Sequence, residues 1–367
     1  MAAVSFLASR LAPTGQFWVG LAGGIALCRA GATYGLRAGY GASVAAMLET
    51  VALIGPARVS GPLTQAITAP LLGRQHARRA ALATQFACCL ALRLAHYAVL
   101  NVLYVWLVVG GLDAYVHSYD KIAGFLGFLP RGQTAALVLT LVSSLAFAAF
   151  YTTMQVAVYR RALRRWDEQP AAAESEPAAP IGARPPRPVV PRRAIAVVAA
   201  AALACVALVA WLSWAVLAGV AGALVAAWVA LRIRDWNALR VGAALAAVLA
   251  VGAIVPVLLG VVDPVTGVQR AARAALLVLV ATWARAALGT EGVRAVAAGA
   301  LWRLRRLPAA TEGAWLTAAI ASDQRLAAAG RSLVDALRDV PSKPLPVADA
   351  VSDWVAAEAD RSLRPAS

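Results

Sequence analysis

Residues 194–231 read AIAVVAAAALACVALVAWLSWAVLAGVAGALVAAWVAL, a run of 38 residues without a charge. As one helix this run would be about 57 Å long, nearly twice the roughly 30 Å of a bilayer's hydrocarbon core. Arg193 and Arg232 flank it, and the positive-inside rule assigns both flanks to the cytoplasmic side. The sequence therefore predicts two membrane-spanning helices joined by a tight turn near residues 211–214, where two tryptophans suit the far interface.

The rest of the chain has the same character, because 61% of its 367 residues are hydrophobic and only 14% are charged, with a mean hydropathy of +0.70. Soluble globular proteins carry about 45–50% apolar and about 25% charged residues. This composition excludes an ordinary soluble enzyme, a disordered chain and a secreted disulfide scaffold. We therefore predict an all-α polytopic membrane protein of the cell (inner) membrane.

About eight transmembrane helices are predicted, in an N-terminal half (residues 1–165) and a C-terminal half (residues 194–290). Each is an apolar run near the roughly 20 residues that a helix needs to cross a bilayer. The predicted spans are residues 11–28, 38–54, 80–112, 134–159, 194–211, 215–231, 241–262 and 271–289. Arg273 and Arg285 interrupt the last run, so an amphipathic helix at the membrane surface is the alternative there.

Residues 59–73 form a shorter apolar segment that contains Pro62 and Pro70. Its length and its prolines predict a re-entrant or half-helical element rather than a full span. Upstream of it, Gly31, Gly35 and Gly39 repeat every fourth residue, a spacing that lets helix backbones approach closely. Such spacing serves packing within one chain more often than dimerisation.

Two segments outside the membrane complete the predicted organisation. Residues 166–193 hold seven prolines and no apolar periodicity, which is typical of an extended linker. Basic residues at both of its ends place this linker in the cytosol. Residues 291–367 show the pattern of soluble helices and predict a cytosolic helical C-terminal tail. Both termini are therefore expected on the cytoplasmic side.

The net charge of +16 comes almost entirely from arginine. In a membrane protein this excess is explained by cytoplasmic loops and anionic headgroups rather than by nucleic acid. The expected partners are the lipid bilayer and other protein subunits, which would bind the linker and the tail. Between Glu312 and Asp360 the tail carries eight of the chain's eighteen acidic residues. Its alternative role is to pack against the protein's own cytosolic loops.

Several kinds of membrane chemistry are excluded by the residues that they need. The chain has neither the phosphate-binding GxxxxGK[ST] pattern nor the zinc-binding HExxH pattern, and only three histidines in all. Its four cysteines lack metal-ligand spacing and are expected to behave as small buried hydrophobes. We therefore predict no cofactor, no metal and no recognisable catalytic residue.

A small polar set within the first 112 residues remains as the candidate site. Glu49 is the only acidic residue there and lies within a predicted span, where a charge is costly. Arg93 and His96 are one helical turn apart, and Asn101 follows on the same helix. Gln65 lies in the proline-bounded segment. We hypothesise that Glu49 pairs with Arg93, as part of a buried substrate site or as a structural ion pair.

Three functions agree with this pattern. The favoured one is a permease-like translocation component without an ATPase of its own, because it uses both the proline-broken segment and the polar set. A non-catalytic membrane subunit of a larger complex is the first alternative. The second is a membrane enzyme that acts on a lipid-linked substrate, with Glu49 or His96 as general base and Arg93 at a phosphate.

Overall fold

The protein is all-helical in the part of the chain that the computed structural model describes. The described residues are 4, 20–54, 60–168, 189–233, 235–258, 260, 262–304, 306–319, 323–341 and 343–363. They form twelve α-helices and one π-helical turn, η2. In chain order these are α3 (Ile25–Ile54), α4 (Ser60–Ala77), α5 (Leu82–Tyr104), η2 (Val105–Val109), α6 (Leu112–Leu126), α7 (Gln133–Glu168), α8 (Arg192–Ala210), α9 (Trp214–Ala230), α10 (Trp236–Leu258), α11 (Pro264–Arg303), α12 (Pro308–Ala319), α13 (Asp323–Leu337) and α14 (Pro344–Leu363).

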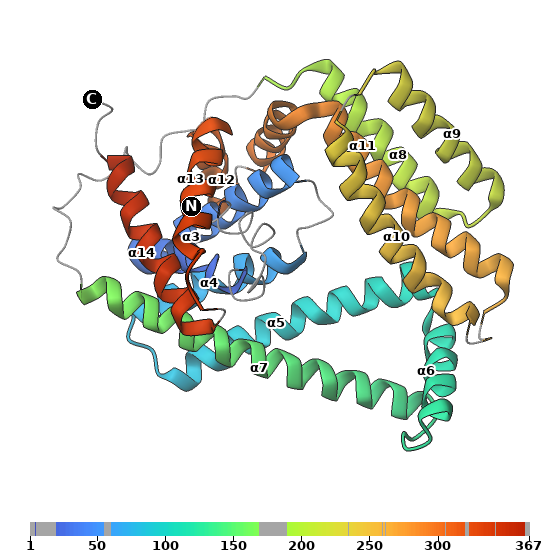
Figure 1. Cartoon of the computed structure of the whole chain (residues 1–367), viewed down its shortest axis with the longest axis horizontal. Helices are drawn as coiled ribbons and strands as arrows, with labels where there is room; N and C mark the ends of the chain where they lie inside the picture. Colours follow the sequence, from blue (N-terminus) through green and yellow to red (C-terminus); the bar gives the residue numbers. More distant parts are fainter. Residues whose placement is uncertain are drawn as a thin grey trace.

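The helices form three groups, which lie at the left, at the right and along the bottom of the view in Figure 1. At the left, α3, α4 and α12 lie together with α13 and α14. At the right, α8, α9 and α10 pack on the long helix α11. Along the bottom, α5 and α7 diverge toward α6, which connects them. α11 also contacts α3 and α12, so it joins the right-hand group to the left-hand group.

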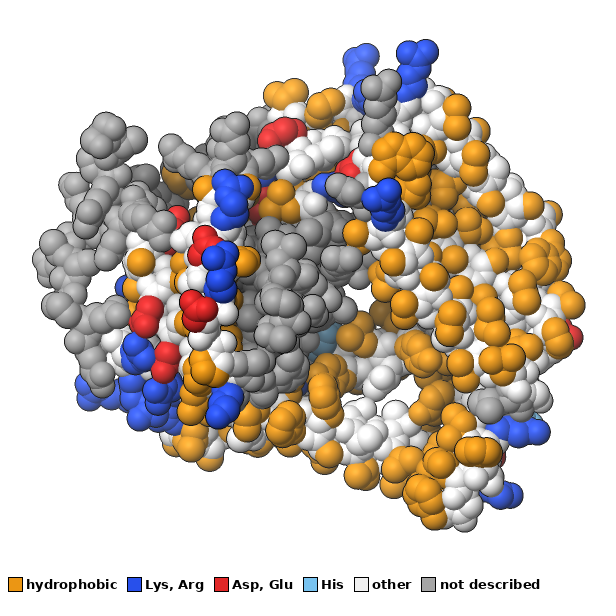
Figure 2. All heavy atoms as spheres, in the orientation of Figure 1, with side chains coloured by type: hydrophobic (Ala, Val, Ile, Leu, Met, Phe, Trp, Pro, Cys, Tyr) orange, Lys and Arg blue, Asp and Glu red, His pale blue; other side chains and the backbone are white. Residues whose placement is uncertain are grey.

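Five helices are long and apolar enough to cross a membrane, which makes the chain a multi-pass membrane protein by its composition. They are α5, residues Gln133–Trp166 of α7, α8, residues Ala238–Leu258 of α10, and α11. Large apolar side chains lie exposed over the right-hand group and along α5 and α7, as lipid-facing surfaces require (Figure 2). The predicted spans 80–112, 134–159, 194–211, 241–262 and 271–289 overlap these five helices.

The other three predicted spans differ. Residues 215–231 fall on α9, an apolar helix of 17 residues that is shorter than the five candidate spans. Residues 38–54 belong to α3, which is not among those candidates. Residues 11–19 of the predicted span 11–28, and residues 169–188 of the predicted linker, lie outside the described part of the chain. The number of eight spans therefore stays a prediction.

The break predicted within residues 194–231 is present. α8 ends at Ala210 and α9 begins at Trp214, with the Ser213 hydroxyl accepting a hydrogen bond from the Val216 amide at 3.4 Å. This contact is an N-cap, which satisfies one of the free amides at the start of α9. Trp211 and Trp214 are both exposed beside the break, as tryptophans at a membrane interface would be.

Residues 60–73 are not interrupted at Pro62 or Pro70, and whether they form a re-entrant or half-helical element stays a prediction. α4 is a single helix of 18 residues that contains Pro70. Pro62 lies in its first turn, where the missing N–H would have no intrahelical partner in any case. Pro70 packs on α3 at Gly31, where a Cβ atom would collide with the Pro70 carbonyl oxygen. The glycine spacing in α3 thus serves contact within the chain.

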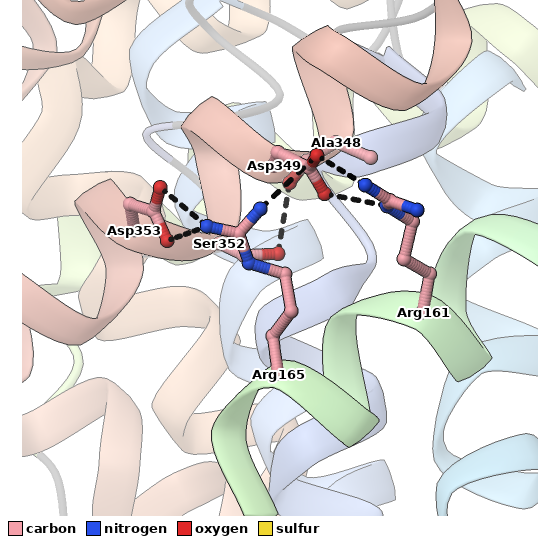
Figure 3. A network of polar contacts seen from close by, with 6 residues as sticks. All are labelled: Arg161, Arg165, Ala348, Asp349, Ser352 and Asp353. Carbon is pink, nitrogen blue, oxygen red and sulfur yellow. Dashed lines mark hydrogen bonds and ion pairs between the residues drawn. The ribbon is translucent and has the colours of Figure 1, made fainter. Parts of the chain in front are cut away.

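The C-terminal helices pack against the N-terminal half. Leu333 of α13 and Val351 and Trp354 of α14 are buried in the same apolar core as Tyr159 of α7. Arginines of α7 also reach aspartates of α14 (Figure 3). Arg161 contacts Asp349 at 2.9 Å, and Arg165 contacts both Asp349 (3.0 Å) and Asp353 (3.1 Å). The apolar face of the tail is therefore covered by the protein itself.

The predicted boundary between membrane half and tail at residue 291 does not coincide with a helix end. α11 continues to Arg303, with a kink at Gly289, where φ is 64° and ψ is 176°. Only glycine adopts this conformation readily, because it has no Cβ atom. The kink lies two residues before the predicted boundary, so α11 includes both the last predicted span and the start of the predicted tail.

Candidate functional site

A buried polar cluster lies where α4, α5 and α7 meet. It consists of Gln65 and Thr68 on α4, Arg93 on α5, and Tyr151 and Gln155 on α7, and we call it the Arg93 cluster. All five side chains are buried, and Arg93 and Gln155 are completely inaccessible to solvent. The surrounding residues of these helices are mostly apolar, so five buried polar side chains at one point are unusual.

Hydrogen bonds join these side chains across the three helices. An Nη atom of Arg93 donates to Oε1 of Gln155, and Nε2 of Gln155 is 2.8 Å from the Thr68 hydroxyl. Nε2 of Gln65 donates to the Tyr151 hydroxyl. The Arg93 guanidinium carbon lies 4.1 Å from the centre of the Tyr151 ring, within the range of a cation–π interaction.

The charge of Arg93 is not balanced by a carboxylate among the described residues. Its Nε and second Nη atoms also have no hydrogen-bond partner there. Arginine stays protonated inside proteins, so the site keeps a full positive charge. Taking such a charge out of water costs several kcal/mol unless an anion or a set of acceptors compensates it. The cluster therefore provides positive potential and unused donors.

Glu49 lies elsewhere, and the predicted Glu49–Arg93 pair is wrong. The Glu49 carboxylate is 1% exposed and accepts two hydrogen bonds from the guanidinium of Arg294 on α11, one of them 3.0 Å long. Arg294 also reaches Glu291 at 2.7 Å. The two partners are 245 positions apart, and the sequence pattern places Arg294 in the tail. The structure instead extends α11 along α3.

His96 and Asn101 do not join the Arg93 cluster. His96 is half-buried one turn after Arg93, and its Nε2 has no hydrogen-bond partner among the described residues. Asn101 is exposed and donates to the Ser144 hydroxyl at 3.4 Å. Of the predicted site residues, the structure brings together only Gln65 and Arg93. The role of each predicted residue stays a prediction.

Thr68, Tyr151 and Gln155 were missed by the sequence analysis. Gln155 is the most polar residue within the 26 uncharged residues of the span 134–159, and this isolation was a usable signal. Its contact with Arg93 could not be predicted, because residue spacing does not show that α5 packs against α7. Thr68 follows Gln65 by three positions and shares its face of α4.

Other arginines of α11 hold the two halves together. Arg285 donates to the carbonyl oxygens of Ala52 (3.1 Å) and Leu53 (2.9 Å) at the end of α3. Arg270 donates to the carbonyl oxygen of Val109 at the end of η2. The last carbonyls of a helix lack intrahelical donors and carry partial negative charge, which a cation stabilises. These arginines therefore have a structural explanation that Arg93 lacks.

The described residues contain no group of three or more histidine, cysteine, aspartate or glutamate side chains that could hold a metal ion. Cys28 and Cys89 are buried and have free thiols. Comparison with protein-family models, with curated proteins and with solved structures finds no match for this chain.

Proposed function

We propose that this chain is a permease-like membrane component without an ATPase of its own, and that it handles an anionic solute at the Arg93 cluster. The observation that carries the proposal is the fully buried Arg93 guanidinium, whose contacts in the described structure are a neutral amide and an aromatic ring. Ionisable residues inside membrane segments are costly and usually mark solute or ion pathways.

The chemistry of the cluster favours an anion. Arginine binds carboxylate and phosphate through a rigid fork of donors, and Arg93 has donors that remain unused. Tyr151 and Gln155 of α7 contact the guanidinium directly. Gln65 and Thr68 of α4 do so indirectly, through hydrogen bonds to Tyr151 and Gln155 respectively. Movement of α4 relative to α5 and α7 would change the polar groups around Arg93. Such a change is what alternating exposure of a solute site needs.

The proposal includes the topology predicted from the sequence. About eight spans would cross the inner membrane in two halves, with the linker, the tail and both termini in the cytosol. The arginines at the ends of α4 and α7 support this sidedness, because they would lie on the same cytoplasmic surface. An ATPase or other subunit would then bind from that side.

Anion-dependent thermal stability of the purified full-length protein tests the proposal. The variants are Arg93→Leu, which removes the charge, and Arg93→Lys, which keeps it. Melting temperatures would be measured in detergent with inorganic phosphate, sulfate, acetate and citrate. A ligand at 100 times its Kd stabilises by about 2.7 kcal/mol. We expect at least one anion to stabilise the wild type and Arg93→Lys, but not Arg93→Leu.

The same variants separate transport from a structural role. A buried charge can be replaced by an apolar residue of similar volume with little loss of stability. Arg93→Leu is therefore expected to fold and to lose labelled-anion exchange in proteoliposomes. If Arg93→Leu unfolds and no anion stabilises the wild type, the cluster is structural and the chain is better explained as a non-catalytic membrane subunit.

A further inference from the structure

A basic pocket lies outside the Arg93 cluster, where α4 and α7 end and α5 begins. It has a volume of about 580 Å³ and is formed by the start of α3, the end of α4, the start of α5 and the end of α7. Arg29, Arg79 and Arg160 line it together with His76, and no acidic residue is among its lining residues. These like charges repel one another, so a bound anion would stabilise the pocket.

Polar groups in this pocket are left without protein partners. The Arg160 Nε atom and the Trp166 indole N–H are buried and have no hydrogen-bond partner in the described structure. The Arg29 guanidinium lies 4.4 Å from the centre of the Trp166 ring, which fixes both side chains at the pocket wall. Buried donors without partners are costly, so a bound acceptor would stabilise this arrangement.

Arg79 reaches the pocket from an unusual backbone conformation. It ends the turn after α4 with a φ of 54°, and its amide donates to the His76 carbonyl at 2.8 Å. Glycine or asparagine normally occupies such a left-handed position after a helix. A left-handed backbone is energetically unfavourable for arginine. A role of the Arg79 side chain in the pocket would explain why arginine occupies this position.

An apolar groove continues from the basic pocket. It has a volume of about 640 Å³ and runs between the start of α5 and α7, with Phe86 and Val156 among its walls. Arg160 lines both the groove and the basic pocket, so the two spaces meet at this side chain. Arg164 is the second arginine of the groove. A basic pocket beside an apolar groove fits an amphiphile, with its anionic head in the pocket and its apolar chain in the groove.

We propose that the basic pocket binds the phosphate of an anionic phospholipid and that the adjoining groove between α5 and α7 holds its acyl chain. The phosphate oxygens would accept hydrogen bonds from Arg79, Arg160 and the Trp166 indole. A phosphate fits because it accepts several hydrogen bonds at once from arginine side chains. This lipid site is independent of the solute site proposed at Arg93.

Native mass spectrometry of the full-length protein tests the site. The protein would be released from micelles that contain phosphatidylglycerol or, in a parallel series, phosphatidylcholine. We expect one phosphatidylglycerol to be retained at concentrations at which phosphatidylcholine is not. Arg79→Gln and Arg160→Gln should each weaken this retention about tenfold. Equal retention of both lipids by the wild type would overturn the proposal.

Arg78→Gln is the matched control, because it removes the same charge from the adjacent, exposed position that does not line the pocket. It should retain phosphatidylglycerol as the wild type does, and a loss equal to that of Arg79→Gln would reduce the effect to general surface charge. Competition with inorganic phosphate distinguishes a lipid from a free anion. If millimolar phosphate displaced the lipid completely, the acyl chain would add nothing to binding, and the proposed role of the groove would be wrong.

A measurement on the unmodified protein keeps the test independent of variant folding. A phosphatidylglycerol analogue with a photoreactive acyl chain should crosslink to the groove formed by residues of α5 and α7. Crosslinks confined to the outer faces of α8 to α10 would overturn the proposal. Variants of Arg93 should leave both the crosslink and the retention unchanged, so the failure of either proposal would be seen separately.

Discussion

The helices around the largest apolar core and the α8–α9 hairpin cover their apolar side chains in different ways. In the group of α3, α4, α7, α13 and α14, protein atoms enclose a continuous core that includes Leu72 and Tyr159. The hairpin contributes only Leu208 and Leu217 to a small buried core with Val280 of α11. A cavity of about 380 Å³ lies between α8, α9 and α11, lined mainly by alanine and other apolar side chains. Lipid would cover the remaining apolar surface of the hairpin.

This difference shows where the chain can place polar groups. Buried charges and amides occur where several helices enclose them, at Arg93 and at the contact of Glu49 with Arg294. α8 and α9 carry no charge between Ala194 and Leu231, because their outer faces have only lipid to contact. We therefore expect substitutions in the enclosed region to have larger effects than matched substitutions in the hairpin.

The largest effect is expected from breaking the contact of α3 with α11. Arg294→Met removes the cation beside Glu49, which is 1% exposed and would be left charged without its partner. Breaking a buried ion pair in this way costs about 3–5 kcal/mol. The double variant Glu49→Leu/Arg294→Met should recover most of this loss, measured as the free energy of unfolding in detergent.

A double-mutant cycle distinguishes this pair from the one that the sequence analysis had proposed. Glu49→Gln and Arg93→Leu should destabilise additively, within about 0.5 kcal/mol, because their side chains do not contact each other. Glu49→Gln and Arg294→Met should show a coupling energy of at least 1 kcal/mol. The reverse pattern would mean that Glu49 is paired with Arg93 after all.

A smaller effect is expected at the tightest helix contact. A Cβ atom at Gly73 of α4 would fall on the carbonyl oxygen of Cys28, which belongs to the backbone of α3 and cannot turn away. Gly73→Ala should therefore destabilise the protein by about 1–3 kcal/mol. Thermal unfolding followed by loss of the monodisperse peak in size-exclusion chromatography would measure it.

The matched substitution in the hairpin should have the opposite sign. Gly219 of α9 has no atom within 4 Å of an added Cβ, and it lies in a helix interior. Alanine is favoured over glycine there by about 1 kcal/mol. Gly219→Ala should thus leave stability unchanged or raise it. Equal destabilisation at both positions would show that the hairpin is packed as tightly as the α3–α4 contact.

The sequence predicted what depends on local pattern and missed what depends on distant contacts. Charge-free length and flanking arginines locate the α8–α9 break, and polar residues in apolar runs indicate Gln65 and Arg93. The partner of Glu49 could not be found in this way, since Arg294 follows a stretch that resembles the start of a soluble tail. The sequence pattern predicts a break at Pro62 because it does not show that α4 begins at Ser60.

The smallest expected effect concerns the docking of α14 on α7. Hydrogen bonds from Arg161 lower the pKa of Asp349 most strongly; burial opposes them, and the charge of Arg165 lowers the pKa further. The folded-state pKa is therefore below the value of about 3.9 for an unfolded chain. The stabilisation is complete above that value and is lost as the pH falls through the folded-state pKa.

Asp349→Asn should consequently lower the melting temperature at pH 7 by only about 1–3 °C, because these contacts are partly exposed. The difference between the variant and the wild type should shrink as the pH falls below about 3.9 and vanish once it is below the folded-state pKa of Asp349, where both carry a neutral side chain at this position. Asp353→Asn is the control, since Asp353 contacts Arg165 alone among the described residues and is half exposed. Its effect should be smaller at every pH. A difference that stays undiminished as the pH falls through the acid range in which aspartate becomes neutral would mean that residue 349 stabilises α14 through its shape rather than its charge.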